Sequence, residues 1–173
     1  MISLASVLGF IAIPLAILRF QMKGLAPLLV CNGLAGGLMA LHYGLSGLQA
    51  GAAMAATASA AAWLQLLVGG RISLKGRFMI ATPAILFCAH LASTTATGWI
   101  ELLPALAFTI GRIAETSRND FTVRVISLFS TSTWIVYLII ENSTPGLIFE
   151  TIGLTSNIIG LARFHRDKFK RKR

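Results

Sequence analysis

The chain has 173 residues, of which 55% are hydrophobic and 12% are charged. A soluble domain carries about 25% charged residues, and a chain of this length has too little interior to bury so much apolar surface. The mean hydropathy of +0.77 therefore excludes a soluble globular domain and a disordered chain, and predicts a polytopic membrane protein.

Seven apolar runs alternate with short polar breaks along the sequence. They cover residues 2–20, 25–45, 48–69, 78–97, 99–114, 121–140 and 145–164. Runs of about 20 residues without a period of two are typical of transmembrane helices rather than barrel strands. The first run is longer than the core of a signal peptide and follows no basic residue, so we expect it to span the membrane.

The net charge of +9 comes from 15 Lys and Arg against six Asp and Glu. The basic residues follow spans one, three, five and seven, in four groups. These are Arg19 and Lys23; Arg71, Lys75 and Arg77; Arg112, Arg118 and Arg124; and Arg163, Arg166, Lys168, Lys170, Arg171, Lys172 and Arg173. This separation favours an odd number of spans, with the N-terminus outside and the C-terminus in the cytoplasm.

An internal repeat relates spans one to three to spans five to seven. With Tyr43 laid on Tyr137, both copies leave an apolar span, cross a short outer loop and enter a helix rich in small residues. Two parallel copies need an inverting span between them, which gives a 3+1+3 arrangement. We expect a first three-helix bundle over 1–70, a linker and inverting helix over 71–97, a second bundle over 98–164, and a basic cytoplasmic tail over 165–173.

The seventh span carries small and polar residues at helical spacing on one face. They are Gly146, Glu150, Gly153, Asn157 and Gly160. A carboxylate within the bilayer is costly and should face the bundle interior or water. Glu150 and Asn157 therefore either line a polar cavity or form interhelical hydrogen bonds.

Two residues of the first bundle are further candidates for the same cavity. Transferring the polar face through the repeat places Trp63 opposite Asn157, although Trp63 is otherwise a lipid-facing aromatic. Asn32 of the second span reaches the same interior. Arg112 and Glu115, three residues apart at the end of the fifth span, are expected to form a local cytoplasmic ion pair.

Several segments carry a family resemblance. They are Glu101-Leu102-Leu103-Pro104, Ser130-Thr131-Ser132-Thr133-Trp134, Glu150, and Asn157-Ile158-Ile159 before Arg163-Phe164. Over residues 40–166 the chain resembles the YgjV-type bacterial inner-membrane family. That family is in turn similar to the SWEET, SemiSWEET and PQ-loop proteins, which are built of three-helix bundles and include sugar and amino-acid carriers. The resemblance implies an all-α membrane protein with a SWEET-like 3+1+3 fold in a bacterial inner membrane.

Two functions of different classes are compatible with these features. The first is a carrier of a small polar solute, such as a sugar or an amino acid, working by alternating access through Glu150, Asn157, Trp63 and Asn32. The second is a membrane scaffold or accessory protein that packs against a partner through its Ala/Gly seams. No motif of an enzyme, metal site or cofactor site is present. We expect anionic lipid, rather than nucleic acid, at the basic tail.

Overall fold

The structure, a computed structural model, describes residues 3–21, 24–69, 74–95, 98–117 and 119–170. These residues form seven α-helices and one short 3-10 helix, which confirms the predicted all-helical class. The elements are α1 (Leu4–Gln21), α2 (Leu25–Leu45), α3 (Gln49–Gly69), α4 (Leu74–Thr95), η1 (Trp99–Glu101), α5 (Leu102–Thr116), α6 (Asp120–Ile140) and α7 (Thr144–Lys170).

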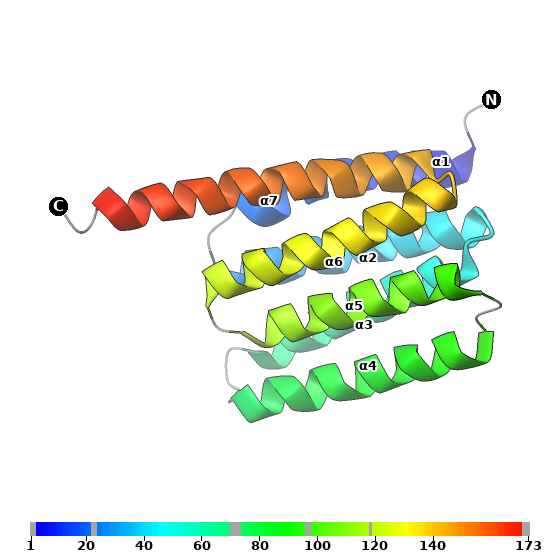
Figure 1. Cartoon of the computed structure of the whole chain (residues 1–173), viewed down its shortest axis with the longest axis horizontal. Helices are drawn as coiled ribbons and strands as arrows, with labels where there is room; N and C mark the ends of the chain where they lie inside the picture. Colours follow the sequence, from blue (N-terminus) through cyan, green and yellow to red (C-terminus); the bar gives the residue numbers. More distant parts are fainter. Residues whose placement is uncertain (1–2, 22–23, 70–73, 96–97, 118, 171–173) are drawn as a thin grey trace.

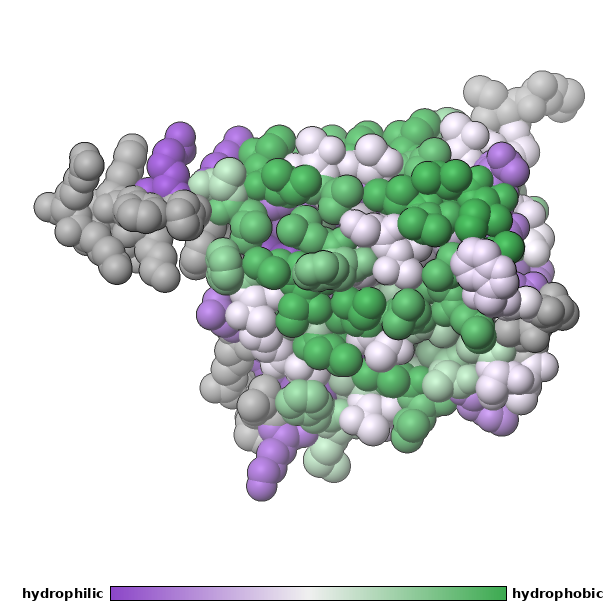
Figure 2. Space-filling view, in the orientation of Figure 1, coloured by the Kyte–Doolittle hydropathy of each residue, from purple (hydrophilic) through white to green (hydrophobic). Residues whose placement is uncertain are grey.

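Six of the described helices, all except α5, are long and apolar enough to cross a membrane. The predicted fifth span over 99–114 begins instead as the 3-10 turn η1 and continues as α5, which has 15 residues. At about 1.5 Å per residue, α5 is about 22 Å long, shorter than the roughly 30 Å hydrocarbon core. In Figure 2, hydrophobic side chains form a band across the middle of the visible face, with hydrophilic residues gathered toward the two ends.

The six helices other than α4 pack in a closed ring. Around the ring, α1 packs on α2, α2 on α3, α3 on α5, α5 on α6, α6 on α7, and α7 on α1. Helix α4, which falls within the predicted linker 71–97, lies outside the ring against α3 and α5 (Figure 1). Successive helices run in opposite directions, so that α1 begins at one end of the bundle and α7 finishes at the other (Figure 1).

Basic residues gather at the end where α1 and α5 finish and α4 and α6 begin, which we call the basic end. They include Arg19, Lys75, Arg77, Arg112, Arg124, Arg163 and Arg166. Helix α7 continues past the bundle to Lys170 (Figure 1), so part of the predicted tail is helical. Lys and Arg favour a helix and interact well with its C-terminal dipole. Residues 171–173 of that tail lie outside the described residues.

The turns between α2 and α3 and between α6 and α7 have the same construction, 95 residues apart. The amide of Leu48 donates to the Tyr43 carbonyl at 2.9 Å, and the amide of Ser143 donates to the Leu138 carbonyl at 3.1 Å. Each turn has one residue of positive φ, at 81° for Gly47 and 54° for Asn142. Gly and Asn adopt this left-handed conformation most readily.

Candidate functional site

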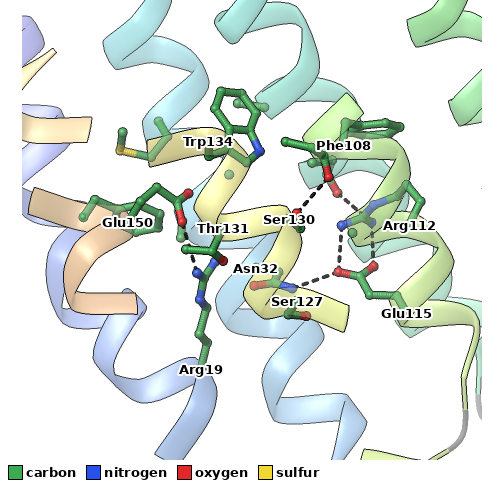
Figure 3. Close-up of a pocket in the computed structure, with 18 of the residues that line it drawn as sticks. Arg19, Asn32, Phe108, Arg112, Glu115, Ser127, Ser130, Thr131, Trp134 and Glu150 are labelled. Atoms are coloured by element: carbon green, nitrogen blue, oxygen red, sulfur yellow. Dashed lines mark hydrogen bonds and ion pairs between the residues drawn. The ribbon is translucent and has the colours of Figure 1, made fainter. Parts of the chain in front are cut away.

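A cavity of about 120 Å³ lies inside the ring and is lined by all six of its helices. Its polar lining comprises Arg19, Asn32, Arg112, Glu115, Ser127, Ser130, Thr131 and Glu150, and its aromatic lining comprises Phe20, Tyr43, Phe108, Trp134 and Phe149. Figure 3 shows Arg19 and Glu150 at one side of the cavity and Arg112 and Glu115 at the other. The cavity thus holds two arginines and two glutamates, a formally neutral set.

The pair on α5 is tightly bound. Arg112 Nη1 lies 2.6 Å from Glu115 Oε2, and Arg112 Nη2 donates to Glu115 Oε1 at 2.7 Å. Asn32 Nδ2 of α2 donates to the same Oε1 at 2.9 Å. Helical spacing of three residues brings the two charged groups together, as predicted, but both side chains are buried rather than exposed at the cytoplasmic surface.

The pair between α1 and α7 is looser. Arg19 Nη2 donates to Glu150 Oε2 at 3.3 Å, and no second bond between the two side chains is present. The guanidinium also lies over two phenyl rings, with its Cζ 4.6 Å from the centroid of Phe20 and 5.5 Å from that of Phe149. Gly153 makes room for this arrangement, because a Cβ there would lie 2.6 Å from Arg19 Nη2.

Aromatic side chains close the cavity toward the end opposite the basic end. Tyr43 and Trp134 stack with their ring centroids 5.9 Å apart and their planes at 7°. Tyr137 meets Trp134 edge-on at 5.8 Å. Tyr137 also lies against Gly51 on α3, where an added Cβ would be 3.3 Å from its hydroxyl. Helices on opposite sides of the ring therefore meet through this cluster.

The structure brings two of the four predicted site residues to the cavity. Glu150 and Asn32 line it, and the carboxylate of Glu150 faces the bundle interior as expected. Asn157 is fully buried on the predicted face of α7, with all the glycines of that face also buried. It is not among the residues that line the cavity, and its Nδ2 instead donates to the Arg124 carbonyl on α6 at 2.9 Å.

Trp63 lies away from the cavity and does not face Asn157. It is 36% exposed, and its indole packs over Gly33 on α2. The two turns are 95 residues apart, one more than the offset between Tyr43 and Tyr137, and counting from the turns pairs Asn157 with Ala62 and Glu150 with Ala55. Ala55 and Ala62 are buried, whereas Trp63, one residue further along α3, lies on another face of that helix.

Several cavity residues were not predicted as part of a site, among them Arg19, Arg112, Glu115 and Trp134. Arg19 was interpreted as an orientation signal, and Arg112 and Glu115 as a surface pair. Trp134 was named only as part of a segment that carries the family resemblance. The spacing of Phe108, Arg112 and Glu115 by four and three residues places all three on one face of α5, and this is the signal that could have identified two of them.

The chain belongs to a family of bacterial inner membrane proteins, Imp-YgjV, whose model matches residues 3–168. No match was found among curated proteins or among solved structures. Family membership and the six apolar helices together identify a multi-pass protein of a bacterial inner-membrane family.

Proposed function

We propose that the protein is a carrier, rather than an enzyme, and moves a small polar solute through the cavity by alternating access. The observation that carries this proposal is the cavity itself, because charged, amide and hydroxyl groups from five of its six helices line it at the centre of an apolar bundle. Ionisable residues inside a membrane are costly and mark substrate or ion pathways. Sites for small solutes commonly lie between helical repeats near the bilayer midplane.

The packing of the helices supports a mechanism in which two groups of helices, one on each side of the cavity, move relative to each other. We propose that α1–α3 and α5–α7 are two similar units and that α4 is the inverting helix of a 3+1+3 arrangement. The two units meet where α1 packs on α7 and where α3 packs on α5, contacts that correspond under a twofold relation. The matching turns, 95 residues apart, fit the same relation. Rocking of one unit against the other would open the cavity to each side in turn.

Proline residues do not mark equivalent hinges in the two units. Pro14 lies inside α1, where it removes a helical hydrogen bond. Pro104 is the third residue of α5, within the first turn, where helix amides have no partner to lose. Pro14 and Pro104 therefore do not occupy equivalent positions in their helices, and we place the motion at the contacts between the units.

The charge distribution sets the orientation of the carrier. We propose that the basic end faces the cytoplasm and the anionic lipid headgroups there, which places the N-terminus outside. In this orientation the stacked Tyr43 and Trp134 lie on the outer side of the cavity, and Leu28 and Ser127 lie nearer the cytoplasm. A terminal fluorescent or alkaline-phosphatase fusion at each end tests this assignment, and a cytoplasmic N-terminus contradicts it.

The carrier proposal is tested by uptake into vesicles reconstituted with the purified protein. A panel of radiolabelled sugars, amino acids and nucleosides should include at least one solute that accumulates above protein-free vesicles. Glu150→Gln should abolish that uptake while the protein stays folded by circular dichroism. Glu141→Gln is the matched control, because Glu141 caps α6 outside the cavity.

Two results contradict the proposal. One is the absence of uptake of every solute by the wild-type protein. The other is unchanged uptake by Glu150→Gln. Absence of uptake together with a reproducible partner in detergent pull-down would favour a scaffold or accessory protein instead.

A further inference from the structure

The two ion pairs of the cavity differ in the number and length of the contacts that their carboxylates receive. The Glu115 carboxylate receives contacts at 2.6, 2.7 and 2.9 Å from Arg112 and Asn32. The Glu150 carboxylate has one contact of this kind, from Arg19 at 3.3 Å, although an ionised carboxylate offers about four acceptor sites. The Glu115 carboxylate therefore has more and shorter contacts than the Glu150 carboxylate, although Arg112 Nε and Glu115 Oε2 have no hydrogen-bond partner within the described residues.

Arg19 also has unused bonding capacity. Its Nε is buried and, like Arg112 Nε, has no hydrogen-bond partner within the described part of the chain. Its guanidinium is positioned by the rings of Phe20 and Phe149 independently of Glu150. Arg19 can therefore stay in place when the carboxylate of Glu150 turns to another partner.

The charge balance of the cavity restricts what can bind between these groups. Two arginines and two glutamates line it, so the lining is formally neutral. A solute with a net charge would leave that charge uncompensated in a medium of low dielectric constant, which is strongly unfavourable. A zwitterion adds one charge of each sign and keeps the balance.

We propose, resting on the carrier function above, that the solute is a small zwitterion with an ammonium and a carboxylate, as in an α-amino acid. Its carboxylate binds Arg19 and its ammonium binds Glu150, which replaces one contact of 3.3 Å by two charge-assisted hydrogen bonds. Tyr43 and Trp134 line the same cavity and offer aromatic faces to the ammonium. Arg112, Glu115 and Asn32 form the fixed opposite wall (Figure 3).

The size of the cavity limits the rest of the solute. At about 120 Å³ it is well below the roughly 300–1,000 Å³ of pockets for drug-sized ligands. It therefore suits an amino acid with a short side chain.

The experiment measures uptake and binding of size-matched analogues by the wild-type protein. The probes are alanine, lactate as the anion without the ammonium, alaninamide as the cation without the carboxylate, and lactamide as the neutral analogue; glycine, serine and proline extend the zwitterions. We expect binding of at least one zwitterion, and binding at least about tenfold weaker for analogues that lack either charge, because each loses a charge-assisted hydrogen bond.

Two charge-changing variants give a readout that a structural role would not produce. Arg19→Gln leaves the lining with an excess negative charge and should shift preference toward alaninamide. Glu150→Gln leaves an excess positive charge and should shift preference toward lactate. Lys75→Gln, at an exposed position outside the cavity, is the control and should keep the wild-type order.

The outcomes separate this inference from the function on which it rests. Uptake of a sugar, lactamide or a singly charged analogue without uptake of any zwitterion overturns the inference and leaves the carrier intact. Absence of uptake of all solutes overturns the carrier proposal. If either variant fails to fold, the order of the four analogues on the wild-type protein decides the question.

Discussion

Truncating the two cavity glutamates should have unequal effects on stability. Glu115→Ala removes three short contacts and leaves the guanidinium of Arg112, whose side chain is 8% exposed, without its carboxylate. Breaking a buried pair in this way costs about 3–5 kcal/mol. Glu150→Ala removes one contact of 3.3 Å and leaves Arg19 on its two phenyl rings, so we expect a loss of about 1–2 kcal/mol, in the range of one hydrogen bond to a charged group.

The comparison is internally controlled, because both substitutions delete the same atoms. The expected difference of about 2–3 kcal/mol corresponds to roughly 4–12 °C in the unfolding midpoint of a chain of this size. Thermal unfolding followed by tryptophan fluorescence in one detergent measures it, with Glu141→Ala as the reference for an acidic residue outside the cavity. Equal losses for Glu115→Ala and Glu150→Ala would refute the distinction between a carboxylate with three short contacts and one with a single longer contact.

Two glycines give further predictions, each measured against Gly37→Ala, where an added Cβ would meet only ordinary contact at 3.6 Å. Gly153→Ala places its Cβ 2.6 Å from Arg19 Nη2, so it should displace the guanidinium and reduce solute uptake while the helical circular dichroism is kept. Gly33→Ala places its Cβ 2.6 Å from Trp63 Cε2, so it should move the indole outward, change its fluorescence emission and cost about 1–3 kcal/mol of unfolding free energy. Unchanged uptake in the first case, or unchanged emission and midpoint in the second, would contradict the packing described at these positions.

Helix positions followed closely from hydropathy, because polar residues break the apolar runs. The predicted runs 25–45 and 121–140 agree with α2 and α6 to within one residue. Helix α4 begins four residues before the predicted run, at Leu74. Its first turn contains Lys75 and Arg77, which lower the hydropathy of the segment without interrupting the helix. Hydropathy locates the part of a helix that suits lipid, whereas its ends depend on backbone hydrogen bonds.

The buried face of α7 was predictable, but the partners of its residues were not. A period of 3.6 places Glu150, Asn157 and three glycines on one face, and all five are buried. That Glu150 meets Arg19, 131 residues away, depends on how α1 and α7 pack. Trp63 illustrates the same limit, since an alignment in error by one residue moves a side chain by about 100° around its helix.

An arginine near the end of a membrane span can either orient the protein in the membrane or place its charge in the bundle interior, and the sequence looks the same in both cases. Position along the chain groups Arg19 and Arg112 with the cations that orient a membrane protein, and both do lie toward the basic end. Their side chains nevertheless point into the bundle, where Arg19 and Glu150 are 12% and 11% exposed. A length of about 7 Å lets an arginine side chain start near the membrane surface and end in the interior, so counting charges by residue number cannot separate the two roles.

Stability alone does not account for the two ion pairs. Replacing a buried pair by apolar residues of similar volume is often neutral or stabilising by about 1–4 kcal/mol. In a bundle whose core is otherwise rich in alanine, such a replacement would also remove the polar lining of the cavity. The pair of Arg112 and Glu115 lies on one helix and is contacted by Asn32, whereas Arg19 and Glu150 join α1 to α7, one of the contacts between the two proposed units. A charge pair that bridges the two proposed units through a single contact of 3.3 Å is suited to exchange its partner for a solute, and this is the physical reason for proposing that Arg19 and Glu150 bind it.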